Sequence, residues 1–273
     1  MWRARMIAAG LRCLLMAGIL AVPLVAGGPA QAITNGQPDG NRHPNVGLMV
    51  VDFGSGPTQW CTGTLIAPTS FLIAGHCISL MQEFGGTVVG VTFDEIPTLD
   101  GTSTVIPAQA VTMDPAFGHD QGDLHDLAVI TLARAAPAQP AVLPRAGLLD
   151  RLAAEGGLRG QRFTSVGYGA TGIAHGGGPP VLILDFARRF TTSPFMALRN
   201  TVLLLLMNTH ATGQGGVCVY DSGSPQFLNT GSGDVLVAVV SSGGDKACVA
   251  NSFNYRLDTP SARAFLGQFV TLP

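Results

Sequence analysis

The chain consists of many short apolar or β-branched runs that Gly, Pro, Asn and Asp residues separate. Runs this short and this closely spaced predict the strands of a β-sandwich or β-barrel, and they argue against alternating β/α units. The 36 glycines fit the frequent turns that such a fold needs. We therefore expect an all-β protein, with its clearest strands at Val46–Val51, Gly63–Ile66, Thr87–Phe93, Leu127–Leu132, Phe163–Val166, Val202–Met207 and Val235–Val240.

An Ala/Pro-rich stretch, Ala133–Pro144, divides these runs into two groups and predicts a domain boundary near residue 140. We place a first β domain at 33–140 and a second at 141–273. The second ends in one expected helix over 260–270, with Thr259 as its N-cap and Pro260 at its first position.

The first 32 residues have the pattern of a secretory signal peptide. Arg3, Arg5 and Arg12 precede and enter an apolar run, and Ala30-Gln31-Ala32 supplies a small-x-small cleavage site. The alternative is a membrane anchor, but the run is shorter than the roughly 20 residues that a span needs. We expect export, with cleavage between Ala32 and Ile33, and no membrane association afterwards.

Charge excludes one class of partner. Removing the three leader arginines leaves 12 basic against 17 acidic residues, a formal net charge of −5. Because no basic cluster is present, the sequence argues against a nucleic-acid partner. We expect a monomer that uses no cofactor and no metal.

Four of the five cysteines belong to the expected mature chain: Cys61, Cys77, Cys218 and Cys248. An even number in an exported chain indicates two disulfides, and the sequence alone permits three pairings. A metal site is the alternative, but no Cys-x-x-Cys pair or His/Cys cluster supports it.

Three motifs carry candidate catalytic residues. His76 ends the run Leu72-Ile73-Ala74-Gly75-His76 and precedes Cys77, while Asp126 directly precedes an apolar strand. Ser222 lies in Cys218-Val219-Tyr220-Asp221-Ser222-Gly223-Ser224-Pro225. A serine needs a base to take its proton, and the base needs an acid that fixes its tautomer. Asp120 and Asp123 are alternative acids, but neither has an apolar run directly after it.

The order histidine, aspartate, serine is that of chymotrypsin-like enzymes. With these motifs, the chain resembles bacterial-type secreted serine proteases of the trypsin/chymotrypsin family. The resemblance covers essentially Ile33 to Val270, and Gly167-Tyr168-Gly169 is similar to the family's Gly-aromatic-Gly strand. It implies two antiparallel six-stranded Greek-key barrels with a closing helix, and the disulfide pairing Cys61–Cys77 and Cys218–Cys248.

The nucleophile loop departs from the family at Tyr220 and Ser224, where the family has glycines. In the family, the N–H groups at the positions of Tyr220 and Ser222 form the oxyanion hole. Loss of one such donor typically costs about 10²–10³ in rate. Tyrosine keeps its N–H, so the question is whether its backbone adopts a glycine-like angle.

The resemblance also implies how the enzyme becomes active. Ile33-Thr34-Asn35-Gly36 is similar to the family's mature start, whose ammonium group pairs with the acid before the nucleophile, here Asp221. We expect leader removal itself to create this N-terminus. The alternative is that Ile33 is simply the first ordered residue.

Substrate binding is expected at two segments. Val240-Ser241-Ser242-Gly243 resembles the strand that pairs with an extended substrate, and Ser241 is also positioned in sequence to support Asp126. Gly216 and Val217 occupy the pocket region, and Gly216 stands where trypsin-like members carry an acid. We therefore expect an uncharged residue before the scissile bond.

Three functions compete. The leading one is a secreted endopeptidase that acts on polypeptides. The second is a weak or inactive homologue that serves as a binding protein, which Tyr220 and Ser224 favour. An esterase would share the triad, but the loop lacks the first glycine of Gly-x-Ser-x-Gly.

Overall fold

The computed structural model of this protein describes residues 33–273, except for 121, 175–180, 209–211, 214 and 246. The expected signal peptide, 1–32, lies outside the described residues and stays a prediction. Within the described part, no helix combines the length and apolar character that crossing a bilayer requires.

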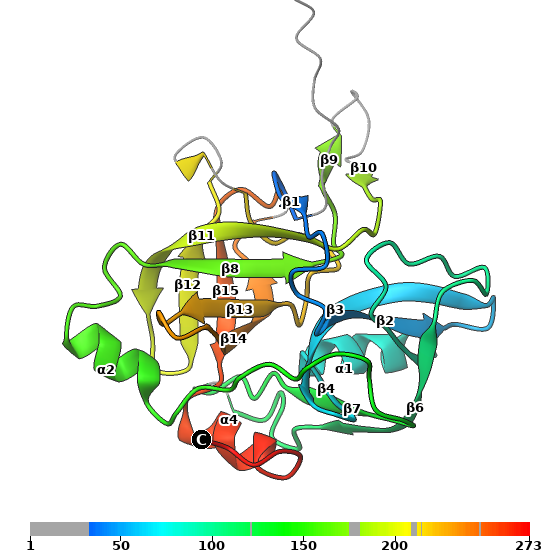
Figure 1. The fold of residues 1–273 in the computed structure, drawn as a ribbon, viewed down its shortest axis with the longest axis horizontal. Helices are drawn as coiled ribbons and strands as arrows, with labels where there is room; N and C mark the ends of the chain where they lie inside the picture. The colour runs from blue at the N-terminus through cyan, green and yellow to red at the C-terminus, as the bar shows by residue number, and fades with distance from the viewer. Residues whose placement is uncertain (1–32, 121, 175–180, 209–211, 214, 246) are drawn as a thin grey trace, which may run out of the picture.

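Six antiparallel strands form a first closed barrel in the order β2-β3-β4-β7-β6-β5 (Figure 1). A helix, α1 (Gly75–Glu83), follows β4. The strands are β2 (Val46–Asp52), β3 (Pro57–Ala67), β4 (Ser70–Ile73), β5 (Thr87–Thr92), β6 (Val105–Met113) and β7 (Ala128–Leu132).

A second barrel lies beside the first in Figure 1 and closes through the pairings of β8 with both β11 and β13. Its order is β8-β11-β12-β15-β14-β13, and the short β1 (Gln37–Pro38) adds to β11. Its strands are β8 (Arg162–Gly167), β11 (Arg189–Leu198), β12 (Val202–Leu206), β13 (Pro225–Asn229), β14 (Asp234–Gly243) and β15 (Asn251–Arg256). A hairpin of β9 (Gly172–Ala174) and β10 (Val181–Ile183) stands apart, and α2 (Leu148–Ala154) precedes β8.

The prediction of two six-stranded antiparallel barrels is confirmed. In each barrel the fourth strand lies beside the first, which is the Greek-key arrangement. The seven strands expected from sequence all form, with ends that differ by a few residues except at β3, which begins at Pro57.

The strand β2 is apolar along its length because both of its faces are covered. Val46 and Leu48 belong to the cluster between the barrels, whereas Met49 and Val51 belong to the interior of the first barrel. The pairing of β2 with β3 shifts register between Leu48 and Val50, which is where the two sets change over. Burial on two sides explains a continuous apolar run where one-sided burial would give alternation.

The C-terminal helix is shorter than predicted. α4 spans Pro260–Leu266, and the Thr259 hydroxyl accepts a hydrogen bond from the Ala262 N–H, as an N-cap should. The helix ends at Leu266, with Gly267 as its C-cap. The expected boundary at residue 270 was therefore wrong by four residues.

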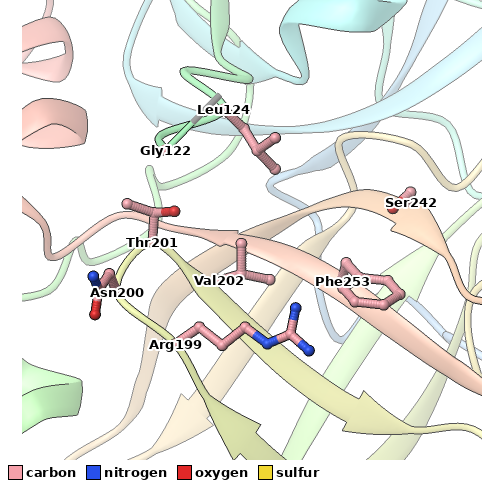
Figure 2. A pocket seen from close by; sticks show the side chains of 8 residues that line it. All are labelled: Gly122, Leu124, Arg199, Asn200, Thr201, Val202, Ser242 and Phe253. Carbon is pink, nitrogen blue, oxygen red and sulfur yellow. The ribbon is translucent and has the colours of Figure 1, made fainter. Parts of the chain in front are cut away.

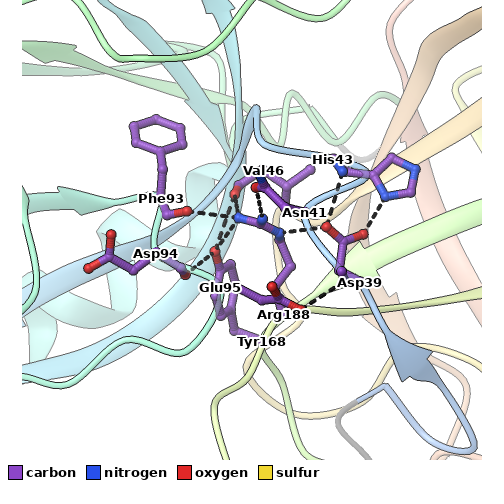
Figure 3. A network of polar contacts seen from close by, with 10 residues as sticks. Asp39, Asn41, His43, Val46, Phe93, Asp94, Glu95, Tyr168 and Arg188 are labelled. Atoms are coloured by element: carbon purple, nitrogen blue, oxygen red, sulfur yellow. Dashed lines mark hydrogen bonds and ion pairs between the residues drawn. The ribbon is translucent and has the colours of Figure 1, made fainter.

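A buried arginine joins the N-terminal segment to both barrels (Figure 3). Arg188 is fully buried, and its Nε donates to the Asp39 carboxylate at 2.9 Å. Burial raises the pKa of Asp39, but hydrogen bonds and charge attraction from His43, together with the Arg188 hydrogen bond, outweigh this effect and hold that pKa below its usual range. The remaining guanidinium donors bind the Asn41 side chain, the Val46 and Phe93 carbonyls and the Tyr168 hydroxyl.

Candidate active site

Strand pairing brings His76 and Asp126 together. His76 lies in the first turn of α1 directly after β4, and Asp126 lies two residues before β7, which pairs with β4. The His76 Nδ1 is 2.8 Å from Asp126 Oδ2, and the His76 N–H donates to Asp126 Oδ1 at 2.8 Å. Asp126 is only 2% exposed. The buried carboxylate therefore fixes both the backbone and the ring of the histidine.

A third group contacts this carboxylate from the other barrel. The Ser241 hydroxyl, on β14, donates to Asp126 Oδ2 at 2.5 Å. Asp126 thus accepts three hydrogen bonds, which compensate for its burial. This is the contact that the sequence analysis expected of Ser241.

Ser222 lies in the turn before β13 and lines the same cavity of about 170 Å³ as His76. No hydrogen bond joins the Ser222 hydroxyl to His76 in the described part of the chain. The loop is anchored by Thr62, a fully buried residue of β3 that the sequence analysis missed. The Thr62 N–H donates to the Ser222 carbonyl at 3.1 Å, and the Thr62 hydroxyl donates to the Tyr220 carbonyl at 3.2 Å.

Tyr220 adopts the backbone conformation that glycine usually provides. Its φ is +73°, in the left-handed region that costs an L-residue roughly 1–2 kcal/mol. Its ring packs edge-on against Trp60 and Phe186, with centroids 6.5 and 5.7 Å away. These ring contacts offset part of the backbone cost, so the loop keeps its shape without glycine.

The N–H groups of Tyr220 and Ser222 have fixed directions. The Val219 carbonyl accepts from the Ala170 N–H, and the Asp221 carbonyl accepts from the Ser224 N–H. In a planar trans peptide the N–H points opposite to the carbonyl, so both N–H groups point away from these partners. Neither donates to an acceptor among the described residues, and both are thus free to bind a ligand.

Asp221 is fully buried between two backbone donors. The N–H groups of Gly169 and Cys218 each donate to its carboxylate at 2.9 Å. Burial raises the pKa of Asp221 to about 7, although these two donors oppose the rise. Within the described residues no cation lies in ion-pair range of this carboxylate.

The predicted partner of Asp221, Ile33, is also fully buried. The next residue, Thr34, is bridged to Gly216: the Gly216 N–H donates to the Thr34 carbonyl at 3.1 Å, and the Thr34 hydroxyl donates to the Gly216 carbonyl at 3.1 Å. Because Ala32 precedes Ile33 in this chain, the Ile33 nitrogen is an amide without charge.

Both disulfides pair as the resemblance implied, Cys61 with Cys77 and Cys218 with Cys248. The first lies directly beside His76. The second joins the segment before Ser222 to the loop that follows β14.

A cavity of about 310 Å³ lies on one side of Ser222. Four of the five predicted substrate-binding residues line it: Val217, Ser241, Ser242 and Gly243. The fifth, Gly216, is not among the described lining residues, because it faces Thr34 and the Met207 side chain.

Sequence reasoning missed Asp245, which also lines this cavity. Its carboxylate accepts from the N–H groups of Ala247, Val249 and Ala250, which hold the loop around Cys248. The sequence did contain one indication of this role, because Asp245 lies three residues before Cys248, which was expected to form a disulfide.

The 170 Å³ cavity lies beside the Cys61–Cys77 disulfide and is largely apolar. Trp60, Leu80, Val219 and Tyr220 line it, none of which the sequence analysis named as an apolar contact. In the described part of the chain, no group of three His, Cys, Asp or Glu side chains is placed to hold a metal ion.

Comparison with known proteins agrees with this geometry. A family model described as Trypsin matches residues 35–264, which is most of the chain. No curated protein matches the sequence.

Proposed function

This chain belongs to the trypsin family of serine proteases, and on that premise we propose that it is a secreted endopeptidase that cleaves polypeptides through an acyl-enzyme. The observation that carries the proposal is the pairing of His76 with the buried Asp126 on the cavity that Ser222 lines. Its two disulfides indicate an oxidising, extracellular environment.

In the proposed reaction, Ser222 Oγ attacks the carbonyl carbon of the scissile peptide. Since His76 Nδ1 is held by Asp126, Nε2 is the nitrogen that takes the serine proton. The same proton then passes to the leaving amine as the carbon–nitrogen bond breaks. Water attacks the resulting ester with His76 again as base, which releases the acid and restores Ser222.

The N–H groups of Tyr220 and Ser222 would stabilise the negative oxygen of the tetrahedral intermediate. The positive φ of Tyr220 and the fixed carbonyls of Val219 and Asp221 support this role, because both donors then have no acceptor among the described residues. The competing function, an inactive homologue that only binds, requires that Tyr220 disable this loop. The glycine-like conformation of Tyr220 favours the enzyme.

Activation would follow removal of residues 1–32. Cleavage before Ile33 would convert a neutral amide into an ammonium group, and Asp221 is a buried carboxylate with no cation in ion-pair range among the described residues. The Thr34–Gly216 bridge supports this step. It binds the residue next to the new N-terminus to Gly216, which precedes Asp221 by five positions in the sequence.

For the residue before the scissile bond, we propose an uncharged side chain. Among the described residues that line the cavity beside Ser222, Asp245 is the one with a carboxylate, and three backbone N–H groups already bind it. Faster cleavage of Arg-ending than of Phe- or Ala-ending chromogenic peptides would contradict this preference.

The test of the whole proposal is labelling of the mature chain, Ile33–Pro273, with a serine-directed fluorophosphonate. We expect labelling of the wild type and of Tyr220→Gly, and none of Ser222→Ala. Labelling of Tyr220→Gly but not of the wild type would mean that Tyr220 blocks the site, and the binding function would then replace the enzyme.

A further inference from the structure

A cavity of about 640 Å³ is lined by residues other than His76, Asp126 and Ser222 (Figure 2). It forms where the segment before Asp126, the turn between β11 and β12, and the strands β14 and β15 meet. Ser242 lines both this cavity and the one beside Ser222, so the two are neighbours. The lining residues are Gly122, Leu124, Arg199, Asn200, Thr201, Val202, Ser242 and Phe253.

Arg199 is the only charged residue among the described lining residues. It is exposed, and its guanidinium lies over the Phe253 ring with Cζ 5.8 Å from the centroid. In the described part of the chain, no carboxylate lies in ion-pair range of this guanidinium, and it donates no hydrogen bond. Arg188, Arg189 and Arg256 all have carboxylate partners.

Hydrogen bonds to its backbone hold the turn that carries Arg199 in place. The buried Arg256 donates to the carbonyls of Arg199 and Asn200 at 3.0 and 2.9 Å. Arg256 is itself fixed by Asp258, at 2.9 Å. The backbone of the turn is therefore organised before any ligand binds, which lowers the entropic cost of using Arg199.

Strand register places this guanidinium close to the proposed substrate strand. Phe253, on β15, pairs with Ser242 on β14 and with Leu204 on β12. Neighbouring strands are about 4.8 Å apart. Phe253 thus lies one strand spacing from Ser242, and because Arg199 lines the same cavity as both, a side chain of a peptide that runs along β14 can extend toward the guanidinium.

We propose that Arg199 selects an acidic side chain of the substrate on the N-terminal side of the scissile bond. This inference rests on the proposed function, because it places the substrate along β14. A planar guanidinium binds a carboxylate through two parallel hydrogen bonds, and the Phe253 ring holds the guanidinium in position for it. A single exposed pair favours glutamate over glutamine by about twofold to fivefold.

The kinetic test uses peptides that share one cleaved sequence and carry Glu, Gln or Lys at one of the positions two to five residues before the bond. We expect about a two- to fivefold higher kcat/KM for Glu than for Gln at one position. Arg199→Gln should abolish this ratio, and Arg199→Glu should reverse it in favour of Lys. The matched control is Arg159→Gln, an exposed arginine after α2, which should keep the wild-type ratio.

Binding to the Ser222→Ala protein separates this inference from the proposed function. Fluorescein-labelled hexapeptide mixtures would carry Glu, Gln or Lys at one fixed position and uncharged residues elsewhere. Tighter binding of the Glu mixture, lost when Arg199→Gln is added, supports the acidic site even if the wild type cleaves nothing. Equal binding of the Glu and Gln mixtures at every position, or a preference that survives Arg199→Gln, overturns it.

Discussion

The two barrels have the same strand order but contribute different chemistry. In each, the connection between the third and fourth strands carries a candidate catalytic residue, His76 in the first and Ser222 in the second. In each, the connection between the fifth and sixth strands adds an acid at the cleft, Asp126 or Asp245. Equal topology therefore brings equivalent loops together, and the residues on those loops decide what each half does.

The two halves also differ in how they hold these loops. In the first barrel, a disulfide from β3 ends at Cys77 beside His76, and α1 fills the connection. In the second, the connection is held by Cys218–Cys248 and by Thr62, which belongs to the other barrel. The nucleophile thus depends on both barrels, whereas the His76–Asp126 pair forms within one.

The largest expected effect tests whether the barrels act as one catalytic unit. Ser222→Ala and His76→Ala should each lower kcat by about 10⁴–10⁶-fold, and the double variant should be no slower than either single one. The measurement is single-turnover hydrolysis of a peptide that the wild type cleaves. Losses that multiply in the double variant would show that each barrel contributes separately.

The next effect compares the two disulfides, one associated with each connection. They close loops of 16 and 30 residues, so in the chain-entropy model their removal costs about 3.1 and about 3.6 kcal/mol. We expect Cys218→Ala/Cys248→Ala to lower the free energy of unfolding slightly more than Cys61→Ala/Cys77→Ala. Urea unfolding in the Ser222→Ala background gives both values without self-cleavage. A larger loss from the first pair would indicate that packing around His76 outweighs loop length.

The smallest effect concerns the buried acid of the second barrel. Burial raises the pKa of Asp221 to about 7, above its unfolded value of 3.8, so the folded chain holds this proton more tightly. The contribution of Asp221 to stability is therefore full below about pH 4 and falls as pH rises toward 7, by at most about 1.4 kcal/mol per unit.

In the chain that still carries residues before Ile33, Asp221→Asn should remove this component of the pH dependence. In the mature chain the new ammonium group should reduce it without any substitution. Unfolding free energies at pH 5, 6 and 7 measure the difference. Identical slopes for the two chain lengths would contradict the proposed pairing of Ile33 with Asp221.

The local pattern of apolar and turn residues was enough to predict the strands, because short apolar runs that turn residues separate are compatible with few folds other than a β-sandwich or β-barrel. The three motifs were enough to select His76, Asp126 and Ser222, which the structure brings to one cleft. The helices α1 and α2 could not be predicted, since neither has a side-chain N-cap and α1 begins at a glycine. Tertiary packing, which one sequence does not display, stabilises them.

Other features depend on partners far away in the chain. Nothing near Thr62 indicates that it anchors the loop of Ser222, 160 residues later, and nothing near Arg188 indicates its bond to Asp39. The sequence raised the question of Tyr220 but could not answer it. The answer, a φ of +73°, depends on ring contacts with Trp60 and Phe186 and on the Thr62 hydroxyl.

The bond between Arg188 and Asp39 has a consequence for the proposed activation. Only five residues separate Ile33 from the anchored Asp39, so a freed N-terminus would be a short tether. Within this segment Thr34 is bridged to Gly216 and Gln37–Pro38 pairs with β11, so the tether is held in place, and short tethers give effective concentrations of the order of millimolar or above. The amine would therefore reach Asp221 from within its own molecule, and activation would not weaken when the protein is diluted after export.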